Sequence, residues 1–397
     1  MFNVQTLNKI SPLAVQALGE GYTVADDVQA PDAILVRSAS MHEMEMPESL
    51  LAIARAGAGV NNIPLDKCAE KGIVVFNTPG ANANAVKELV LTGMLLSCRK
   101  VVDGIAWAKT LKGNGDAVGK MVEKGKSQFV GPEIKGKTLG VIGLGAIGIL
   151  VANAAAALGM NVVGYDPYLS VERAISVAPE VKYVATLDEI YADSDFITIH
   201  VPLTPDTKGV INAESIAKMK DGVRILNFSR ADLVVSTDIL KGIADKKIAC
   251  YVTDFATDDI LGEDGVIALP HLGASTPESE DNCAKMAGAE IKDFLENGNI
   301  KNSVTLPNVS LARSGAARVC VIAKNASNVL ADVCAKITEN GSTVVASANQ
   351  SKKDYTYMIF DTTAPVDADA LKAVDGVIRS YWNLKPITVQ KGEKTNV

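Results

Sequence analysis

A chain of 397 residues with 48% hydrophobic and 21% charged residues is expected to fold as two or three globular domains rather than remain disordered. Its formal net charge of −7 argues against a general nucleic-acid or acidic-membrane binder, so any anionic ligand needs locally placed cations and backbone N–H groups. The six cysteines lack paired or metal-ligand spacing, and the sequence shows no leader-like start and no apolar run of about 18 residues, which predicts a cytoplasmic protein without metal or membrane span.

The first 95 residues alternate short apolar runs with helical stretches. Apolar runs at 34–36, 51–54 and 73–76 predict strands of a small parallel α/β unit. Residues 84–102 predict a long helix. Residues 112–137 break the pattern with six glycines and six lysines, which predicts a mobile, basic connection.

A glycine motif follows this connection. Gly143, Gly145 and Gly148 have G-x-G-x-x-G spacing, after an apolar run and at the start of an alanine-rich helical stretch. The first glycine permits a tight turn, the second lets a pyrophosphate approach the backbone, and the third lets helix and strand pack closely. The next strand leads to Asp166, whose carboxylate can accept hydrogen bonds from an adenosine ribose. Glycine spacing alone also fits an ordinary turn, but strand, helix and acid together predict an NAD site.

The remaining predicted strands and helices form two patterns, each typical of a different domain fold. Residues 138–275 keep a strand–helix rhythm, which predicts a doubly wound parallel sheet. A helical stretch at 277–297 and a linker-like segment at 300–309 follow. Residues 318–384 read as strand, helix, strand, strand, helix, strand, which is the ferredoxin-like βαββαβ plan.

Four polar residues follow strands of the doubly wound sheet: Arg230, Asp254, Asp259 and His271. Taken singly, the arginine could be a surface charge, the aspartates solvated or helix-capping, and the histidine structural. Together, at the edge where such sheets bind ligands, they match the needs of a hydroxy-acid dehydrogenase. A histidine can take the hydroxyl proton, a carboxylate can stabilise the protonated ring, and an arginine can clamp the substrate carboxylate.

These residues lie in segments that carry a resemblance to the D-specific 2-hydroxyacid dehydrogenase family over essentially the whole chain. Besides the glycine motif, the segments are 34–38, 56–62, 75–80, 200–204, 227–230 and 270–276. The last is the most specific for the branch that oxidises 3-phospho-D-glycerate to 3-phosphohydroxypyruvate with NAD, the first step of serine biosynthesis. Two alternatives stay open: another reaction of the family, such as glyoxylate or hydroxypyruvate reduction, and a non-catalytic NAD-sensing regulator on the same scaffold.

The resemblance implies an α/β fold with a Rossmann nucleotide domain, residues 95–278, inserted in a flavodoxin-like substrate domain, residues 1–94 and 279–303. A ferredoxin-like, ACT-like domain would occupy residues 316–397. The resemblance further implies dimerisation through the nucleotide domain, and hence a homodimer or homotetramer that acts on a small phosphorylated hydroxy acid. Neither nucleic acid nor a membrane is an expected partner.

Carried over position by position, the resemblance makes Arg230 the ligand of the substrate carboxylate, His271 the acid–base catalyst and Asp259 its acidic partner. The substrate's phosphate and carboxylate would also contact Arg37, Ser38 and Asn61. The implied cofactor contacts are Gly143, Gly145, Ala146, Ile147, Gly148, Asp166, His200, Val201, Pro202, Thr207, Ser229, Asp254 and Gly273.

The chain departs from the family pattern in two places. Where the family usually has a glutamate beside the histidine, this chain has Asp259, with Asp258 next to it, so the pairing is expected at longer range or after a loop shift. In serine-inhibited relatives, a Pro-Gly turn joins the first strand and helix of the ACT domain. Here that turn is Asn325-Ala-Ser-Asn, which predicts a domain that mediates assembly rather than one that binds serine.

Overall fold

The computed structural model describes residues 1–382 and divides into two compact units. Of the described residues, 1–81 and 280–382 form the first unit, and 82–279 form the second. The predicted boundary at 94/95 falls inside helix α3 (Ala83–Arg99), all of which belongs to the second unit. Within the described residues, no helix is both long enough and apolar enough to cross a bilayer.

The first unit begins with a five-stranded parallel sheet. Its strands β1 (Phe2–Thr6), β2 (Tyr22–Ala25), β3 (Ala33–Val36), β4 (Ala52–Arg55) and β5 (Val74–Asn77) lie in the order β2-β1-β3-β4-β5. This is the flavodoxin-like order, which confirms the predicted fold class. The helices beside this sheet are α1 (Leu13–Leu18), α2 (Leu65–Glu70) and α11 (Pro277–Asn297).

Helix α11 returns the chain to this sheet. It has the predicted bounds 277–297, and its Ala287, Ile291 and Phe294 share one buried core with strand residues Val4 and Leu35. Gly288 lets the helix approach α1 closely, because a Cβ at this position would lie 2.4 Å from the carbonyl oxygen of Ala14. The segments before and after the second unit therefore complete one domain.

The second unit is a doubly wound sheet, as predicted. Seven parallel strands lie in the order β12-β11-β10-β9-β6-β7-β8, and the chain reverses direction across the sheet between β6 and β9. Their bounds are β6 (Thr138–Ile142), β7 (Asn161–Tyr165), β8 (Val181–Tyr183), β9 (Phe196–Ile199), β10 (Val223–Asn227), β11 (Ile248–Thr253) and β12 (Val266–Ala268). Ligands of such folds bind at this reversal, outside the carboxyl ends of the strands.

Six helices accompany this sheet. They are α3, α6 (Ala146–Ala157), α7 (Val171–Ala174), α8 (Leu187–Asp193), α9 (Ala213–Lys218) and α10 (Ser236–Ala244). Five of them contribute to two cores, one that contains residues of α3 and α6 and one that contains residues of α8, α9 and α10, whereas α7 has no buried residue.

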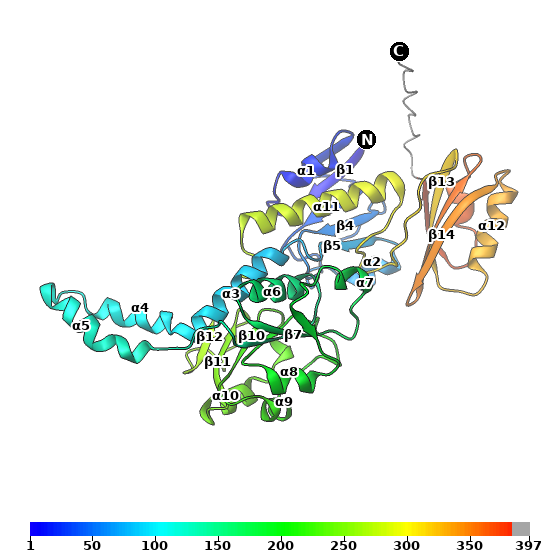
Figure 1. Cartoon of the computed structure of the whole chain (residues 1–397). Helices are drawn as coiled ribbons and strands as arrows, with labels where there is room; N and C mark the ends of the chain where they lie inside the picture. The colour runs from blue at the N-terminus through cyan, green and yellow to red at the C-terminus, as the bar shows by residue number, and fades with distance from the viewer. Residues whose placement is uncertain (383–397) are drawn as a thin grey trace, which may run out of the picture. The chain divides into compact units, whose positions relative to one another are not determined.

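The predicted mobile connection at 112–137 is wrong for most of its length. Helices α4 (Val101–Thr110) and α5 (Val118–Gly125), with short 3₁₀ turns at 115–117 and 126–129, form a helical arm that extends from this unit (Figure 1). Two glycines of the predicted connection allow close packing: a Cβ on Gly125 would lie 2.3 Å from the Trp107 ring, and a Cβ on Gly131, just after the arm, would lie 1.7 Å from the carbonyl oxygen of Cys98. The predicted helix 84–102 is divided at Lys100, which has a left-handed backbone (φ 47°).

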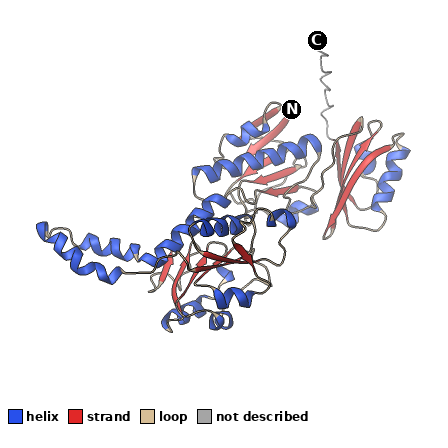
Figure 2. Cartoon of the chain, viewed as in Figure 1, coloured by secondary structure: helices blue, strands red, loops and turns tan. Residues whose placement is uncertain are grey.

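The C-terminal part of the first unit has the predicted βαββαβ plan (Figure 2). Strands β13 (Ala317–Lys324), β14 (Val344–Lys352), β15 (Tyr355–Thr362) and β16 (Val377–Trp382) form an antiparallel sheet in the order β14-β15-β13-β16. Helices α12 (Val329–Glu339) and α13 (Ala368–Leu371) cover one face of it. The predicted domain extends to 397, but its last residues, 383–397, lie outside the described part of the chain.

The other face of this sheet packs against the first domain of the same unit. Cys320, Ile322, Tyr357 and Ile359 belong to the core that contains Phe294 of α11. The linker-like segment 300–309 is itself anchored, because the Val75 amide donates to Thr305 Oγ1 and the Val304 amide donates to the Val75 carbonyl. The C-terminal sheet is thus an integral part of the first unit.

Candidate functional site

The glycine motif forms the turn between β6 and α6. Gly143 has φ 95°, and a Cβ there would lie 2.7 Å from the His200 carbonyl oxygen. A Cβ on Gly148 would lie 1.9 Å from the carbonyl oxygen of Gly143, so strand and helix meet backbone to backbone. By contrast, a Cβ on Gly145 would have no neighbour within 4 Å. The loop is therefore closed against protein at its two ends and open at the residue expected to face a pyrophosphate.

Asp166 closes the other side of this loop. It follows β7, and its carboxylate accepts hydrogen bonds from the backbone amides of Leu144 (2.9 Å) and Tyr168 (2.8 Å). Ala146 and Ile147 begin α6, whose first-turn amides lack intrahelical acceptors and carry the positive end of the helix dipole. An acid and a set of free amides thus lie on the same edge of the sheet.

His200 follows β9 on the opposite side of the glycine loop. Its Nε2 lies 2.9 Å from Thr198 Oγ1, whereas its buried Nδ1 has no hydrogen-bond partner among the described residues. Burial lowers the pKa of this imidazole to about 3, so the ring is neutral near pH 7. Val201 and Pro202 continue the chain, and Thr207 Oγ1 donates to the Pro202 carbonyl (2.6 Å), which closes the turn at 202–207.

Asp254 directly follows β11, as His200 directly follows β9. Its Oδ2 accepts a hydrogen bond from the Gly273 amide (2.9 Å), and its buried Oδ1 has no partner in the described part of the chain. Burial raises the pKa of this carboxyl group, and the Gly273 amide opposes the shift. The Ser229 hydroxyl donates to the Ile199 carbonyl (2.6 Å) and so ties the β9 and β10 ends together.

His271 is held by backbone contacts in an uncommon conformation. Its φ is 41°, which is sparsely populated for a residue with a side chain and costs of order 1 kcal/mol or more. The conformation persists because the His271 amide donates to the Asp254 carbonyl (3.0 Å) and the Leu269 amide donates to the Thr253 carbonyl (2.8 Å). Strain maintained by hydrogen bonds at a strand end supports a functional role for this histidine.

Arg230 and His271 meet on a common side chain that the sequence did not single out. The Phe255 ring lies 4.6 Å from the His271 ring, centroid to centroid, and the Arg230 guanidinium carbon lies 5.8 Å from the same phenylalanine centroid. The Arg230 Nη1 donates to the Ser229 carbonyl (2.6 Å), and the Asn227 side chain donates to the Arg230 carbonyl (2.8 Å). Loops after β10, β11 and β12 therefore converge around Phe255.

Asp259 does not contact His271 in this structure. Its Oδ1 accepts a hydrogen bond from Thr257 Oγ1 (2.5 Å), which lowers the pKa of the carboxyl group. Within residues 1–382, no ion pair or hydrogen bond joins His271 to Asp259 or to Asp258. The pairing expected from the resemblance thus requires a rearrangement of the 257–259 loop.

The residues expected to hold a phosphate lie at the carboxyl edge of the first unit's sheet. Arg37 follows β3 and forms an ion pair with Glu280 (2.7 Å). The Asn8 side-chain oxygen accepts from the amides of Arg37, Ser38 and Ala39, and so fixes the turn that carries them. The Asn61 carbonyl lies 2.9 Å from His42 Nε2.

A second arginine lies at this edge. Arg55 ends β4, and its Nε–H donates to the Arg37 carbonyl (3.0 Å). Its guanidinium occupies the space over Gly57, where a Cβ would lie 2.0 Å from Nη1. The Arg-Ala-Gly-Ala-Gly run at 55–59 was the sequence signal for it, since this glycine leaves room for a folded-back arginine.

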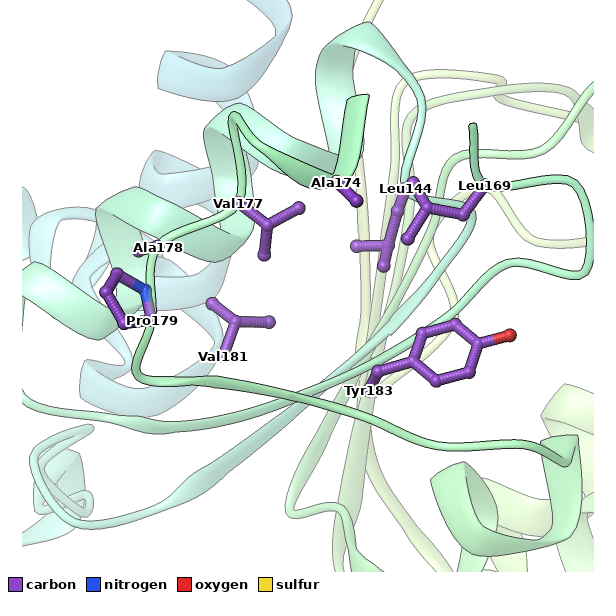
Figure 3. A pocket seen from close by; sticks show the side chains of 8 residues that line it. All are labelled: Leu144, Leu169, Ala174, Val177, Ala178, Pro179, Val181 and Tyr183. Atoms are coloured by element: carbon purple, nitrogen blue, oxygen red, sulfur yellow. The ribbon is translucent and has the colours of Figure 1, made fainter. Parts of the chain in front are cut away.

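An apolar pocket of about 250 Å³ lies beside the glycine loop, beneath the short crossover helix α7 (Figure 3). The labelled aliphatic side chains converge on it, and the Tyr183 hydroxyl points away from them toward the Asp166 carbonyl, to which it donates (3.2 Å). None of the predicted site residues lines it; the lining residues are Leu144, Leu169, Ala174, Val177, Ala178, Pro179, Val181 and Tyr183. The pocket lacks the cations and free amides that a diphosphate needs.

The residues at the edge of the seven-stranded sheet fit a nicotinamide dinucleotide. The open space over Gly145 and the α6 amides suit a pyrophosphate, and the Asp166 carboxylate suits a ribose diol. The unpartnered His200 Nδ1 and Asp254 Oδ1 are buried polar atoms of the kind that a bound ligand's amide or hydroxyl groups satisfy. Among the described residues, no cluster of three or more potential metal ligands is present.

Comparison with known proteins also identifies the second unit as an NAD-binding domain. Residues 91–273 match the model of the NAD-binding domain of the D-isomer specific 2-hydroxyacid dehydrogenases. The chain is 36% identical to D-3-phosphoglycerate dehydrogenase of Methanocaldococcus jannaschii over 73% of its own length and 55% of that protein's, and 32% identical to that of Bacillus subtilis over 77% and 59%. The chain therefore spans little more than half the length of these relatives.

Solved structures agree on the fold. NAD-bound 3-phosphoglycerate dehydrogenase of Entamoeba histolytica is 27% identical, with a TM-score of 0.57, and the match covers 76% of this chain and 98% of that one. A glyoxylate reductase from Paecilomyes thermophila is 24% identical with a TM-score of 0.63, and the match covers 76% of this chain and 98% of that one. This second likeness concerns the fold alone.

Proposed function

We propose that this chain, a member of the D-isomer specific 2-hydroxyacid dehydrogenase family that binds NAD, oxidises 3-phospho-D-glycerate to 3-phosphohydroxypyruvate, the first step of serine biosynthesis. The observation that carries the proposal is the convergence of Arg230 and His271 on one ring, at the same sheet edge as the glycine loop. A sensor of NAD needs no such pair. This arrangement thus favours catalysis over the regulator alternative.

In the proposed reaction, Arg230 binds the substrate carboxylate through its guanidinium and so orients C2. The imidazole of His271 takes the proton of the C2 hydroxyl, a transfer that histidine can perform near neutral pH. The bound NAD supplies the hydride acceptor. Asp259, after the 257–259 loop rearranges, stabilises the protonated ring, and the neutral His200 and the buried Asp254 hold polar groups of the cofactor.

We assign the substrate's phosphate to Arg37 and Arg55, with Ser38 and Asn61 beside them. Two guanidinium groups at one sheet edge suit a dianion, and Arg37 can exchange its exposed partner Glu280 for a phosphate at low cost. A simple glyoxylate or hydroxypyruvate reductase has no need for this second cationic site. The two arginines thus favour a phosphorylated substrate.

A spectrophotometric assay of NADH formation with phosphoglycerate, glycerate and lactate in parallel tests the function. We expect a clear preference for phosphoglycerate, and His271→Ala should lower kcat by roughly 100-fold or more with little change in NADH affinity. Arg37→Ala should raise KM for phosphoglycerate more than it lowers kcat, and should spare the unphosphorylated acids. Equal activity on all three acids would refute the phosphate assignment, and no NADH with any of them would refute the function.

We further propose that the chain forms a homodimer or homotetramer through the α4–α5 arm. Neither helix of the arm has a buried residue, and the arm exposes Val101, Val102, Ile105 and Met121 to between 36% and 52%. Exposed apolar side chains on a projecting hairpin suit a second copy of the chain. Light scattering after Ile105→Glu should report a smaller particle than the parent.

The ACT-like domain is proposed to serve assembly rather than serine binding. The Asn325 side chain already forms hydrogen bonds within the domain, since its amide donates to the Lys353 carbonyl and its oxygen accepts from Ser351 and Thr356.

A cytoplasmic location is proposed because all six cysteines are free thiols, as is usual in a reducing compartment.

A further inference from the structure

We infer that Phe255 is a positioning residue that sets the geometry of Arg230 and His271 relative to each other. The inference rests on the proposed function, in which those two side chains bind substrate and move its proton. The Phe255 ring contacts both, with a centroid distance of 4.6 Å to the His271 ring and 5.8 Å to the Arg230 guanidinium carbon.

The position of Phe255 is itself fixed by its backbone. Its amide donates to Thr253 Oγ1 (3.0 Å), and the residue forms an antiparallel bridge with Pro270, directly before His271. The ring is half-buried, so it is held by protein on part of its surface and presents the rest to the two polar side chains. A ring on a fixed backbone restricts the rotamers of side chains that pack against it, as the His271 ring does at an interplanar angle of 45°.

Neither Arg230 nor His271 is held by a hydrogen bond or an ion pair to a carboxylate among the described residues; the Asp254 carboxylate acts on both only through longer-range electrostatic attraction. Within the described residues, neither forms an ion pair, and the one hydrogen bond from the Arg230 guanidinium goes to the Ser229 carbonyl. The family's usual orienting acid has its counterpart in Asp259, which faces Thr257 instead. The Phe255 ring is therefore the group in direct contact with both side chains, and we assign to it the orientation that no hydrogen-bonded carboxylate supplies.

The chemistry of the contact suits both partners. The face of an aromatic ring carries partial negative charge, which attracts the guanidinium of Arg230 and the imidazolium that His271 becomes during the reaction. A leucine of similar volume keeps the apolar contact but removes this charge distribution and the flat aromatic ring. A tyrosine keeps both.

The first experiment observes the contact without any need for activity. The chain has three histidines, His42, His200 and His271, so ¹³C-labelled histidine rings give a small set of NMR signals, and His271→Gln identifies the third. In the parent, the His271 ring, which lies 4.6 Å from the Phe255 ring at an interplanar angle of 45°, should show a ring-current shift and a nuclear Overhauser contact to the Phe255 ring. In Phe255→Leu the His271 signal should move toward its random-coil position while the other two stay in place.

The second experiment measures kinetics of Phe255→Leu, Phe255→Tyr and a matched control. We expect Phe255→Leu to lower kcat by about 10-fold or more with NADH affinity unchanged, and to narrow the pH range of activity, because a misplaced catalytic group costs rate rather than cofactor binding. Phe255→Tyr should restore kcat to within about 3-fold of the parent. Phe2→Leu removes a half-buried ring from the Phe2–Tyr22 pair of the first unit and should leave kcat unchanged.

An unshifted His271 signal in the parent or in Phe255→Leu would overturn the inference, as would equal kcat in Phe255→Leu and Phe2→Leu. The parent spectrum carries the test if Phe255→Leu does not fold. Failure of the proposed function is a separate result, namely a parent that oxidises no hydroxy acid while its spectrum still reports on the Phe255–His271 contact.

Discussion

Two glycine-rich segments of the second unit use the same residue in different ways. In the loop at 143–148, the outer glycines meet protein backbone and the middle one faces open space. In the segment 112–136, Gly125 and Gly131 face Trp107 and the Cys98 carbonyl, whereas a Cβ on Gly113, Gly115 or Gly119 would have no neighbour within 4 Å. A high glycine content therefore does not show whether a segment binds a ligand or packs against protein, or whether it is ordered or mobile. The atoms that surround each glycine show this.

The largest effect should come from Gly145→Val. Its backbone (φ −79°, ψ −165°) accepts valine and the space over it is free, so the protein should fold with an unchanged melting temperature. NADH affinity should fall by about 100-fold or more, because side-chain bulk displaces the pyrophosphate from amides worth about 1.5–3 kcal/mol each. Fluorescence titration with NADH measures the affinity, and a thermal melt measures the melting temperature. A variant that binds NADH like the parent would show that the open space is not a cradle.

Asp166→Ser tests the acid that completes the same loop. An aspartate opposes the 2′-phosphate of NADP by about 4 kcal/mol per charge pair at 4 Å and an effective dielectric near 20, so the parent should prefer NAD. The variant should raise the NADP-to-NAD ratio of kcat/KM by about 10-fold or more. Asp188→Ser, at an exposed acid paired with Lys218, is the control. An unchanged ratio would remove Asp166 from the ribose site.

Gly131→Ala tests packing in the arm. The added methyl would lie 1.7 Å from the Cys98 carbonyl oxygen, so the chain must move away from the end of α3. We expect a loss of about 1–3 kcal/mol in the free energy of unfolding, as for other overpacked sites. Denaturant titration measures it, with NADH affinity as the control that should stay the same under native conditions. An unaltered stability would mean that the segment after the arm is mobile, as its composition suggested.

Gly119→Ala should have the smallest effect, and the opposite sign. Gly119 lies inside α5 with free space around its Cβ, so alanine should stabilise the helix by about 0.5–1 kcal/mol. The same titration measures the gain. A loss of stability, or a change in particle size, would place a second copy of the chain against this face of the arm.

The sequence predicted the doubly wound sheet and the C-terminal plan because buried parallel strands and amphipathic helices leave a periodic pattern. Strands β8 and β12 have three residues each, which is too short to give a periodic pattern, and the helical arm was not predicted because its glycines resemble those of a linker. The glycine loop and Asp166 were predictable from spacing, since one turn and one strand fix their positions. The contact of Phe255 with Arg230 and His271 was not, because it joins loops after three different strands and depends on side-chain rotamers.

The docking of the C-terminal sheet has a thermodynamic consequence. Arg318 and Asp361 form a buried bidentate ion pair (2.6 and 3.0 Å), and Arg318 also donates to the Asn297 carbonyl at the end of α11, as Tyr357 does to that of Gly298. A core shared by two sheets unfolds cooperatively, so calorimetry should record both sheets of the first unit in a single transition. Removing the C-terminal sheet would then expose apolar core and a buried end of α11, and a truncated chain would report on lost stability as much as on lost regulation.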